Sequence, residues 1–155
     1  MTASELLANL KAHANPANVA GMARYGDRAM VTHVLSQMFE AATHFGMRLP
    51  ELFCGFPRRA GEPPVGYPVA CLPQAWSSGA VFLLLQSCLG ITIDGWRHEV
   101  VIDRPELPQQ LDRMQIRGLA IDGDAVDLCF ERIGARTAAS VGGTTPARIN
   151  VLTRL

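Results

Sequence analysis

One glutamate stands close in the sequence to aromatic residues, a combination of side chains suited to carbohydrate chemistry. Glu51 lies in the segment Leu49–Leu52, and a stretch rich in proline and glycine separates it from Trp76. Tyr67 lies within that stretch. Aromatic rings can stack on the apolar faces of sugars, and a carboxylate can exchange a proton during cleavage of a glycosidic bond. These side chains are of the kind that a sugar site uses, and Glu51 is the candidate catalytic residue.

Each of these residues also has a structural interpretation that the sequence leaves open. Glu51 follows a proline, and its carboxylate could cap a turn or a short helix. Tyr67 and Trp76 could be packing residues of the core. Gln74 stands near the start of a predicted helix, where its amide could bind a sugar hydroxyl or cap the helix.

The longest amphipathic pattern predicts a helix over Asp27–Phe45, whose apolar residues recur at spacings of one, three and four. Asp27 is placed to cap its beginning, and Gly46 is placed to end it. Shorter helices are predicted over Ala3–Ala12 and Ala17–Arg24.

A second long helix is predicted from Pro73 to about Leu89, because proline fits the first position of a helix and Gly90 can stop it. From Gly79 onward almost every residue is apolar, so we expect this helix to be buried on all sides. The segment Met47–Leu72 holds five prolines and three glycines. It is predicted to be an ordered loop, and ordered loops of this length usually carry function.

After Gly90 the pattern changes to alternation, which indicates strands. The dipeptides Asp94-Gly95 and Asp122-Gly123 are typical of tight turns, and the second predicts a hairpin. The predicted strands are Ile91–Asp94, Glu99–Asp103, Arg113–Ile121, Ala125–Ile133, Thr137–Val141 and Arg148–Arg154. We therefore predict an α+β fold, with a helical part over residues 1–90 and a small antiparallel β unit over residues 91–155.

Composition excludes several classes of function. The chain has 14 basic and 14 acidic residues, so no net charge favours nucleic acid as a partner. Its longest apolar run is too short to span a membrane, and no signal peptide is recognisable, so we expect a cytoplasmic protein. The four cysteines have no spacing typical of zinc sites and are expected to be free thiols; we expect no metal and no cofactor.

Two phrases, RLPELFCGFPR and YPVACLPQAWSSGAVFLLLQ, resemble the C-terminal part of the amylo-alpha-1,6-glucosidase (glycogen debranching enzyme) family. The resemblance covers roughly Ala20–Leu155 and is densest over Arg48–Leu89. It implies that the helical part is the end of an (α/α) six-hairpin toroid. It also implies inverting hydrolysis of α-1,6-glucosidic linkages, with Glu51 as the general base.

The resemblance further implies that Tyr67, Gln74 and Trp76 contribute to binding an α-glucan or oligosaccharide. The family's general acid belongs to a segment that this chain lacks, and residues 11–18 match the family's lead-in poorly. An inverting glycosidase needs both an acid and a base. We therefore expect the isolated chain to be an inactive fragment.

A non-catalytic carbohydrate-binding or partner-docking module is the alternative function. The hydrophobic fraction of 48% is high for a chain of this size with 18% charged residues. Some apolar surface is therefore expected to contact a second copy of the chain or the missing portion of the toroid.

Overall fold

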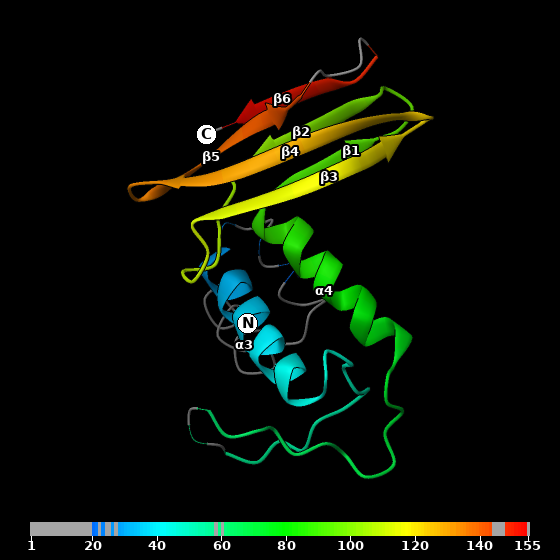
Figure 1. Cartoon of the computed structure of the whole chain (residues 1–155), viewed down its shortest axis with the longest axis vertical. Helices are drawn as coiled ribbons and strands as arrows, with labels where there is room; N and C mark the ends of the chain where they lie inside the picture. The colour runs from blue at the N-terminus through cyan, green and yellow to red at the C-terminus, as the bar shows by residue number, and fades with distance from the viewer. Residues whose placement is uncertain are drawn as a thin grey trace, which may run out of the picture.

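The computed structural model describes residues 28–57, 61–143 and 148–154, together with residues 20, 21, 23, 26 and 59. Two helices, α3 (Arg28–His44) and α4 (Ala75–Cys88), precede six strands (Figure 1). The strands are β1 (Ile91–Asp94), β2 (Glu99–Asp103), β3 (Arg113–Ile121), β4 (Asp124–Ile133), β5 (Arg136–Gly142) and β6 (Asn150–Arg154). The predicted α+β class, with helices before Gly90 and strands after it, is confirmed for these residues.

Helix α3 forms where the amphipathic pattern predicts it, and Val31, Val34 and Leu35 on one face are buried. It ends at His44, and Gly46 follows with a φ of +61°, a conformation that glycine adopts without strain. The predicted cap Asp27 and the predicted helix Ala3–Ala12 lie outside the described residues. Of the predicted helix Ala17–Arg24, residues 20, 21 and 23 are described, and each is helical.

Helix α4 begins two residues later than predicted, at Ala75, and Gln74 occupies its N-cap position. The prediction that α4 is buried on all sides is wrong. Its buried residues, Ser77, Ala80, Leu84 and Cys88, recur at spacings of three and four and therefore form one face. Phe82 on another face is 73% exposed. The reason is that α3 is the long helix packed against α4 in the described part of the chain, and one helix covers one face.

The strands form two three-stranded sheets, ordered β1–β2–β6 and β3–β4–β5. The Asp122-Gly123 hairpin between β3 and β4 is confirmed, and both residues have positive φ values, as a type I′ turn requires. The prediction of a wholly antiparallel unit is wrong at one pair, because β6 runs parallel to β2. Three strands of the other sheet separate β2 from β6, and so long a connection lets the chain return in the same direction.

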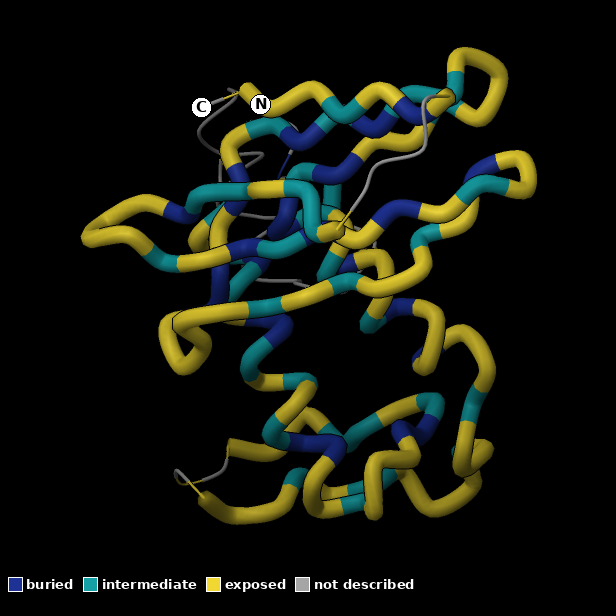
Figure 2. Tube along the Cα trace, turned by 45° about the horizontal axis from the view of Figure 1, so that its top comes forward, coloured by how far each residue is buried: buried dark blue, intermediate teal, exposed yellow. Residues whose placement is uncertain are grey.

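Two hydrophobic clusters hold the molecule together, and the end of α4 belongs to both. Leu84 and Cys88 pack with α3 in the helical cluster, whereas Leu89 packs in the cluster that both sheets share. Leu85 is partly buried against each cluster. The sheet cluster also contains Val100, Ile102, Ile121, Val126, Leu128 and Phe130, so buried residues run through the layers of strands in Figure 2. The two sheets therefore bury a common core, and α4 connects that core to α3.

Candidate functional site

The segment between α3 and α4 is a long loop whose two arms are joined by backbone hydrogen bonds. Near its base the Gln74 N–H donates to the Leu49 carbonyl, at 3.1 Å, and the Glu51 N–H donates to the Cys71 carbonyl, at 2.9 Å. Farther out, the Cys54 N–H donates to the Val65 carbonyl, at 2.8 Å. The loop lies at the end of the molecule opposite the sheets (Figure 1). Its prolines are accommodated because few of its backbone groups take part in a ladder.

Aromatic rings fix this loop to α3. The rings of Phe45 and Phe53 meet edge to face, with their centroids 5.4 Å apart. Phe53 pairs with Gly66 in an antiparallel bridge, and Gly66 lies beside the Phe45 ring, which an added Cβ atom would meet at 3.5 Å. The first arm of the loop, which carries Glu51, is therefore held by packing as well as by hydrogen bonds.

Glu51 is half-buried at the base of the loop. Its Oε2 accepts a hydrogen bond from the Cys71 N–H, at 3.4 Å, so the carboxylate lies against the opposite arm. This contact supports the structural interpretation of Glu51 as a residue that stabilises a turn. The same contact restrains one oxygen of the carboxylate, which stays partly exposed.

The three predicted sugar-binding residues lie at the same end of the molecule as Glu51. Tyr67 pairs through its backbone N–H with the Leu52 carbonyl, at 3.2 Å, one residue beyond Glu51. Trp76 lies in the first turn of α4. The Tyr67 and Trp76 residues are 49% and 51% exposed, so neither is a buried packing residue.

Gln74 caps α4, as one of the two interpretations predicts. Its Oε1 accepts a hydrogen bond from the Ala75 N–H, at 2.9 Å, and satisfies one of the free donors at the helix start. The Ser77 hydroxyl donates to the Pro50 carbonyl, at 2.8 Å, and ties this helix start to the residue before Glu51. The loop base and α4 thus form one connected unit.

A partner for Glu51 in acid–base catalysis is not evident in the loop. Between residues 45 and 76 the other acidic residue is Glu62. It lies toward the tip, beyond the Cys54–Val65 pairing, where its Oε2 accepts from the Arg59 N–H at 3.1 Å. The two carboxyls of an inverting site flank the same bond, roughly 6.5–9.5 Å apart. These two carboxyls instead lie at opposite ends of the paired arms.

Sequence reasoning missed a recess of about 740 Å³ beside Arg28, Asp103 and Arg104, at the sheet end of the helices. Positions 28 and 103 are far apart in the chain, and no local pattern indicates that they meet. Only the packing of α3 on α4, and of α4 on the sheet, brings them together.

The cysteines are free, in agreement with the prediction. Burial, with a smaller effect of the nearby Glu106 carboxylate, raises the pKa of the Cys88 thiol to about 12. Cys88 is therefore a packing residue and not a nucleophile at neutral pH. Among the described residues no three His, Cys, Asp or Glu side chains are grouped so that they could hold a metal ion. None of the described helices is both long and apolar enough to cross a membrane.

Comparison of the chain with known protein families, curated proteins and solved structures finds no match.

Proposed function

We propose that the chain binds α-glucan through the loop that carries Glu51, as the base-bearing part of a debranching-type glycoside hydrolase. One observation carries the proposal: a restrained carboxylate and the half-exposed Tyr67 and Trp76 belong to one hydrogen-bonded unit at the base of the loop. The rings would stack on glucose units. Glu51 would occupy the place of the base that removes a proton from the attacking water.

The resemblance to the amylo-alpha-1,6-glucosidase family supports the identity of the glycan and the inverting stereochemistry. The exposed apolar side of α4 supports the idea that α3 and α4 are the last helices of a toroid, since further helices would cover that side. The four free cysteines support a reducing compartment, and we place the protein in the cytoplasm.

The separation of Glu51 from Glu62 supports an inactive chain. General acid catalysis contributes roughly 10²–10⁴-fold to the rate, and positioning of the substrate contributes more. A non-catalytic carbohydrate-binding module is the second candidate, favoured by the same exposed rings without an acid beside the carboxylate.

Titration with a branched dextrin that carries α-1,6-linked glucosyl residues, followed by calorimetry and by glucose release, tests the proposal. We expect binding without glucose release. Trp76→Ala should weaken binding by about tenfold, whereas Trp96→Ala, at an exposed turn of the sheet half, should leave it unchanged. Absence of binding would refute the carbohydrate function. Glucose release that Glu51→Gln abolishes would refute the inactive fragment and show that an acid has been overlooked.

Glu51→Gln separates the two candidates further. A base that also hydrogen-bonds the bound sugar contributes to affinity, so the debranching-type site predicts weaker binding in this variant. A module that relies on ring stacking predicts unchanged affinity. Because the carboxamide oxygen can still accept from the Cys71 N–H, the fold of the loop should survive, which circular dichroism can check.

A further inference from the structure

The recess missed by sequence analysis lies where α3 and α4 meet the β1–β2–β6 sheet. Helix α3 separates it from the Glu51 loop, by roughly 25 Å for 17 residues. Its volume of about 740 Å³ falls in the range of small-molecule sites, roughly 300–1,000 Å³. The polar and charged residues along it are Arg28, Gln86, Ser87, Thr92, Asp103 and Arg104.

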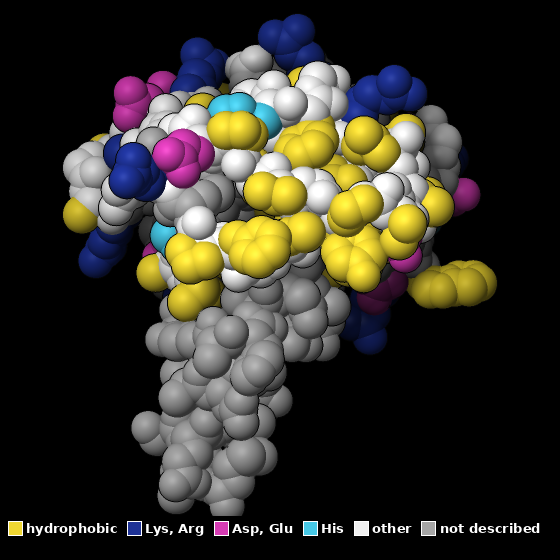
Figure 3. Space-filling model, turned by 90° about the horizontal axis from the view of Figure 1, so that it is seen from below, with side chains coloured by type: hydrophobic (Ala, Val, Ile, Leu, Met, Phe, Trp, Pro, Cys, Tyr) yellow, Lys and Arg dark blue, Asp and Glu magenta, His cyan; other side chains and the backbone are white. Residues whose placement is uncertain are grey.

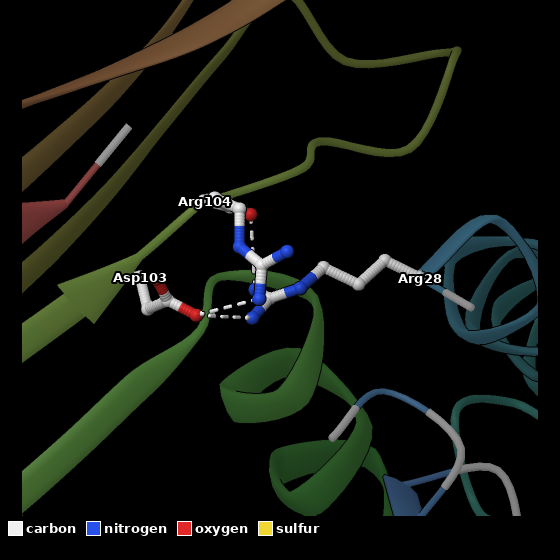
Figure 4. Close-up of polar contacts among 3 residues, drawn as sticks. All are labelled: Arg28, Asp103 and Arg104. Carbon is white, nitrogen blue, oxygen red and sulfur yellow. Dashed lines mark hydrogen bonds and ion pairs between the residues drawn. The ribbon is translucent and has the colours of Figure 1, made fainter. Parts of the chain in front are cut away.

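Two guanidinium groups in this recess share a single carboxylate oxygen (Figure 4). Nη2 of Arg28 and Nη2 of Arg104 each lie 3.2 Å from Oδ2 of Asp103. The described residues lining the recess therefore carry two positive charges and one negative charge. The Arg28 side chain is only 10% exposed, so water compensates its charge poorly. An anion is the ligand that would balance this group of charges.

Arg28 is held rigidly in place. Its Nη1 donates to the Arg104 carbonyl, at 2.9 Å. Its guanidinium passes beside Gly90, where a Cβ atom would collide with Arg28 Nη1 and with the Asp103 carbonyl oxygen. Glycine at position 90 thus makes room for the cation, which reaches the sheet from α3. A preorganised guanidinium loses little freedom when it binds an oxyanion.

Arg104 offers the donors that a ligand can reach. Its side chain is 61% exposed, and its described side-chain contact is the one with Asp103. A guanidinium has five N–H donors in a planar fork, which matches two oxygens of a phosphate or a carboxylate. The fork therefore retains donors for a second oxyanion beside Asp103.

The remaining polar residues indicate that the ligand is larger than an inorganic ion. Gln86 donates through Nε2 to the Ile91 carbonyl, at 3.0 Å, which fixes its amide. Ser87 and Thr92 also line the recess, and the Ser87 hydroxyl donates to the Leu83 carbonyl, at 2.7 Å. These groups suit a ligand body that carries hydroxyls, and a bare phosphate would leave most of the volume empty.

We propose that this recess binds a phosphate monoester of a small polyhydroxylated molecule, about as large as a hexose phosphate. The phosphate contacts Arg104 and the exposed edge of Arg28, and the body of the ligand lies along Gln86, Ser87 and Thr92. This site is independent of Glu51 and of the proposed function, because it shares no residue with the loop.

Calorimetry with glucose 6-phosphate, glucose and inorganic phosphate, at fixed ionic strength, tests the site. Glucose 6-phosphate should bind, and inorganic phosphate should bind at least about tenfold more weakly because it lacks the body of the ligand. Arg104→Gln should weaken binding of glucose 6-phosphate by about tenfold or more, since it removes a charge-assisted contact. The matched control Arg97→Gln, an exposed arginine in the turn after β1, should leave it unchanged.

Trp76→Ala serves as a second control, because it alters the proposed glycan site and should not affect binding of glucose 6-phosphate. Equal losses in Arg104→Gln and Arg97→Gln would mean attraction to overall charge and would overturn the proposal. So would undetectable binding of glucose 6-phosphate at millimolar concentration, or equal affinity for inorganic phosphate.

Asp103→Asn should change the affinity for glucose 6-phosphate in the opposite direction to Arg104→Gln. If the three side chains merely tie α3 to the sheet, this variant loses stability and gains nothing. If the recess receives an anion, removal of the competing carboxylate should also tighten binding of glucose 6-phosphate by about threefold or more at low salt. Circular dichroism should establish that the variant is folded. A folded Asp103→Asn protein with unchanged or weaker binding contradicts the proposal.

Discussion

At the scale of single residues, Gly90 has two roles that no other type of amino acid could fill together. It ends α4 with a φ of +62°, and it lies so close to β2 that a side chain would collide with the Asp103 carbonyl oxygen. The Gly90 carbonyl also accepts the Asp103 N–H, at 3.1 Å. The backbone at position 90 therefore sets how closely α4 approaches the sheet.

Gly90→Ala should lower the free energy of unfolding by more than about 2 kcal/mol, because backbone strain adds to the collision. Gly134→Ala is a matched control, since Gly134 has the same φ of +62° and nothing within 4 Å of an added Cβ. It should cost about 1–2 kcal/mol, from backbone strain alone. Urea unfolding measures both variants, and equal losses would show that the approach of α4 to β2 is not restrictive.

At the scale of elements, α4 is apolar on nearly every face yet buried on only one. Leu84 is fully buried between α4 and α3, whereas its neighbour Leu83 is exposed. Hydrophobic composition thus indicates which residues are able to be buried, and the arrangement of neighbouring elements decides which of them are. Because α4 runs without a break from the Glu51 loop to the sheet, the residues that it buries also hold these two parts of the molecule together.

Leu84→Ala should destabilise the protein by about 2–5 kcal/mol, because it opens a cavity between the helices. Leu83→Ala makes the same chemical change at an exposed position and should alter stability by less than about 1 kcal/mol. Thermal or urea unfolding distinguishes them. A large loss in Leu83→Ala would mean that this face of α4 is covered in solution.

At the scale of the whole molecule, the helical half exposes an unusual amount of apolar surface. Hydrophobic side chains gather on the end of the molecule seen from below (Figure 3). Among the described residues of this half, the exposed large apolar ones, apart from Tyr67 and Trp76, are Phe39, Met47, Leu52, Phe56, Val65, Val69, Leu72, Phe82 and Leu83. Exposed apolar side chains that gather on one end of a molecule are typical of a surface that contacts a partner.

For the chain on its own, without the further helices of the proposed toroid, we propose that a second copy of the chain covers this surface. Phe82 is the most exposed aromatic residue of α4. Phe82→Asp should therefore shift the protein toward monomer by sedimentation or light scattering, with little change in circular dichroism. Ile133→Asp, at an exposed position of the sheet half, is the control and should leave the mass unchanged. A monodisperse wild-type monomer at micromolar concentration contradicts the dimer.

The elements and the local turns could be predicted from the sequence. A period of 3.6 located α3, Pro73 and Gly90 bounded the predicted α4, and alternation located the strands. Asp122-Gly123 predicted its hairpin. These signals all depend on residues close in the chain. The sequence also pointed to Glu51, which stands near aromatic residues in the sequence, and to Gln74, which stands at the start of a predicted helix. Their catalytic or binding roles stay predictions.

Three further features depend on how the elements pack in the tertiary structure. These are the parallel pairing of β6 with β2, the exposed side of α4, and the meeting of Arg28 with Asp103 and Arg104. Each depends on which elements lie side by side after long connections. Local periodicity carries no information on such contacts, because they join residues far apart in the chain. The entropy cost of closing the long loops between those residues is offset only by packing elsewhere in the fold.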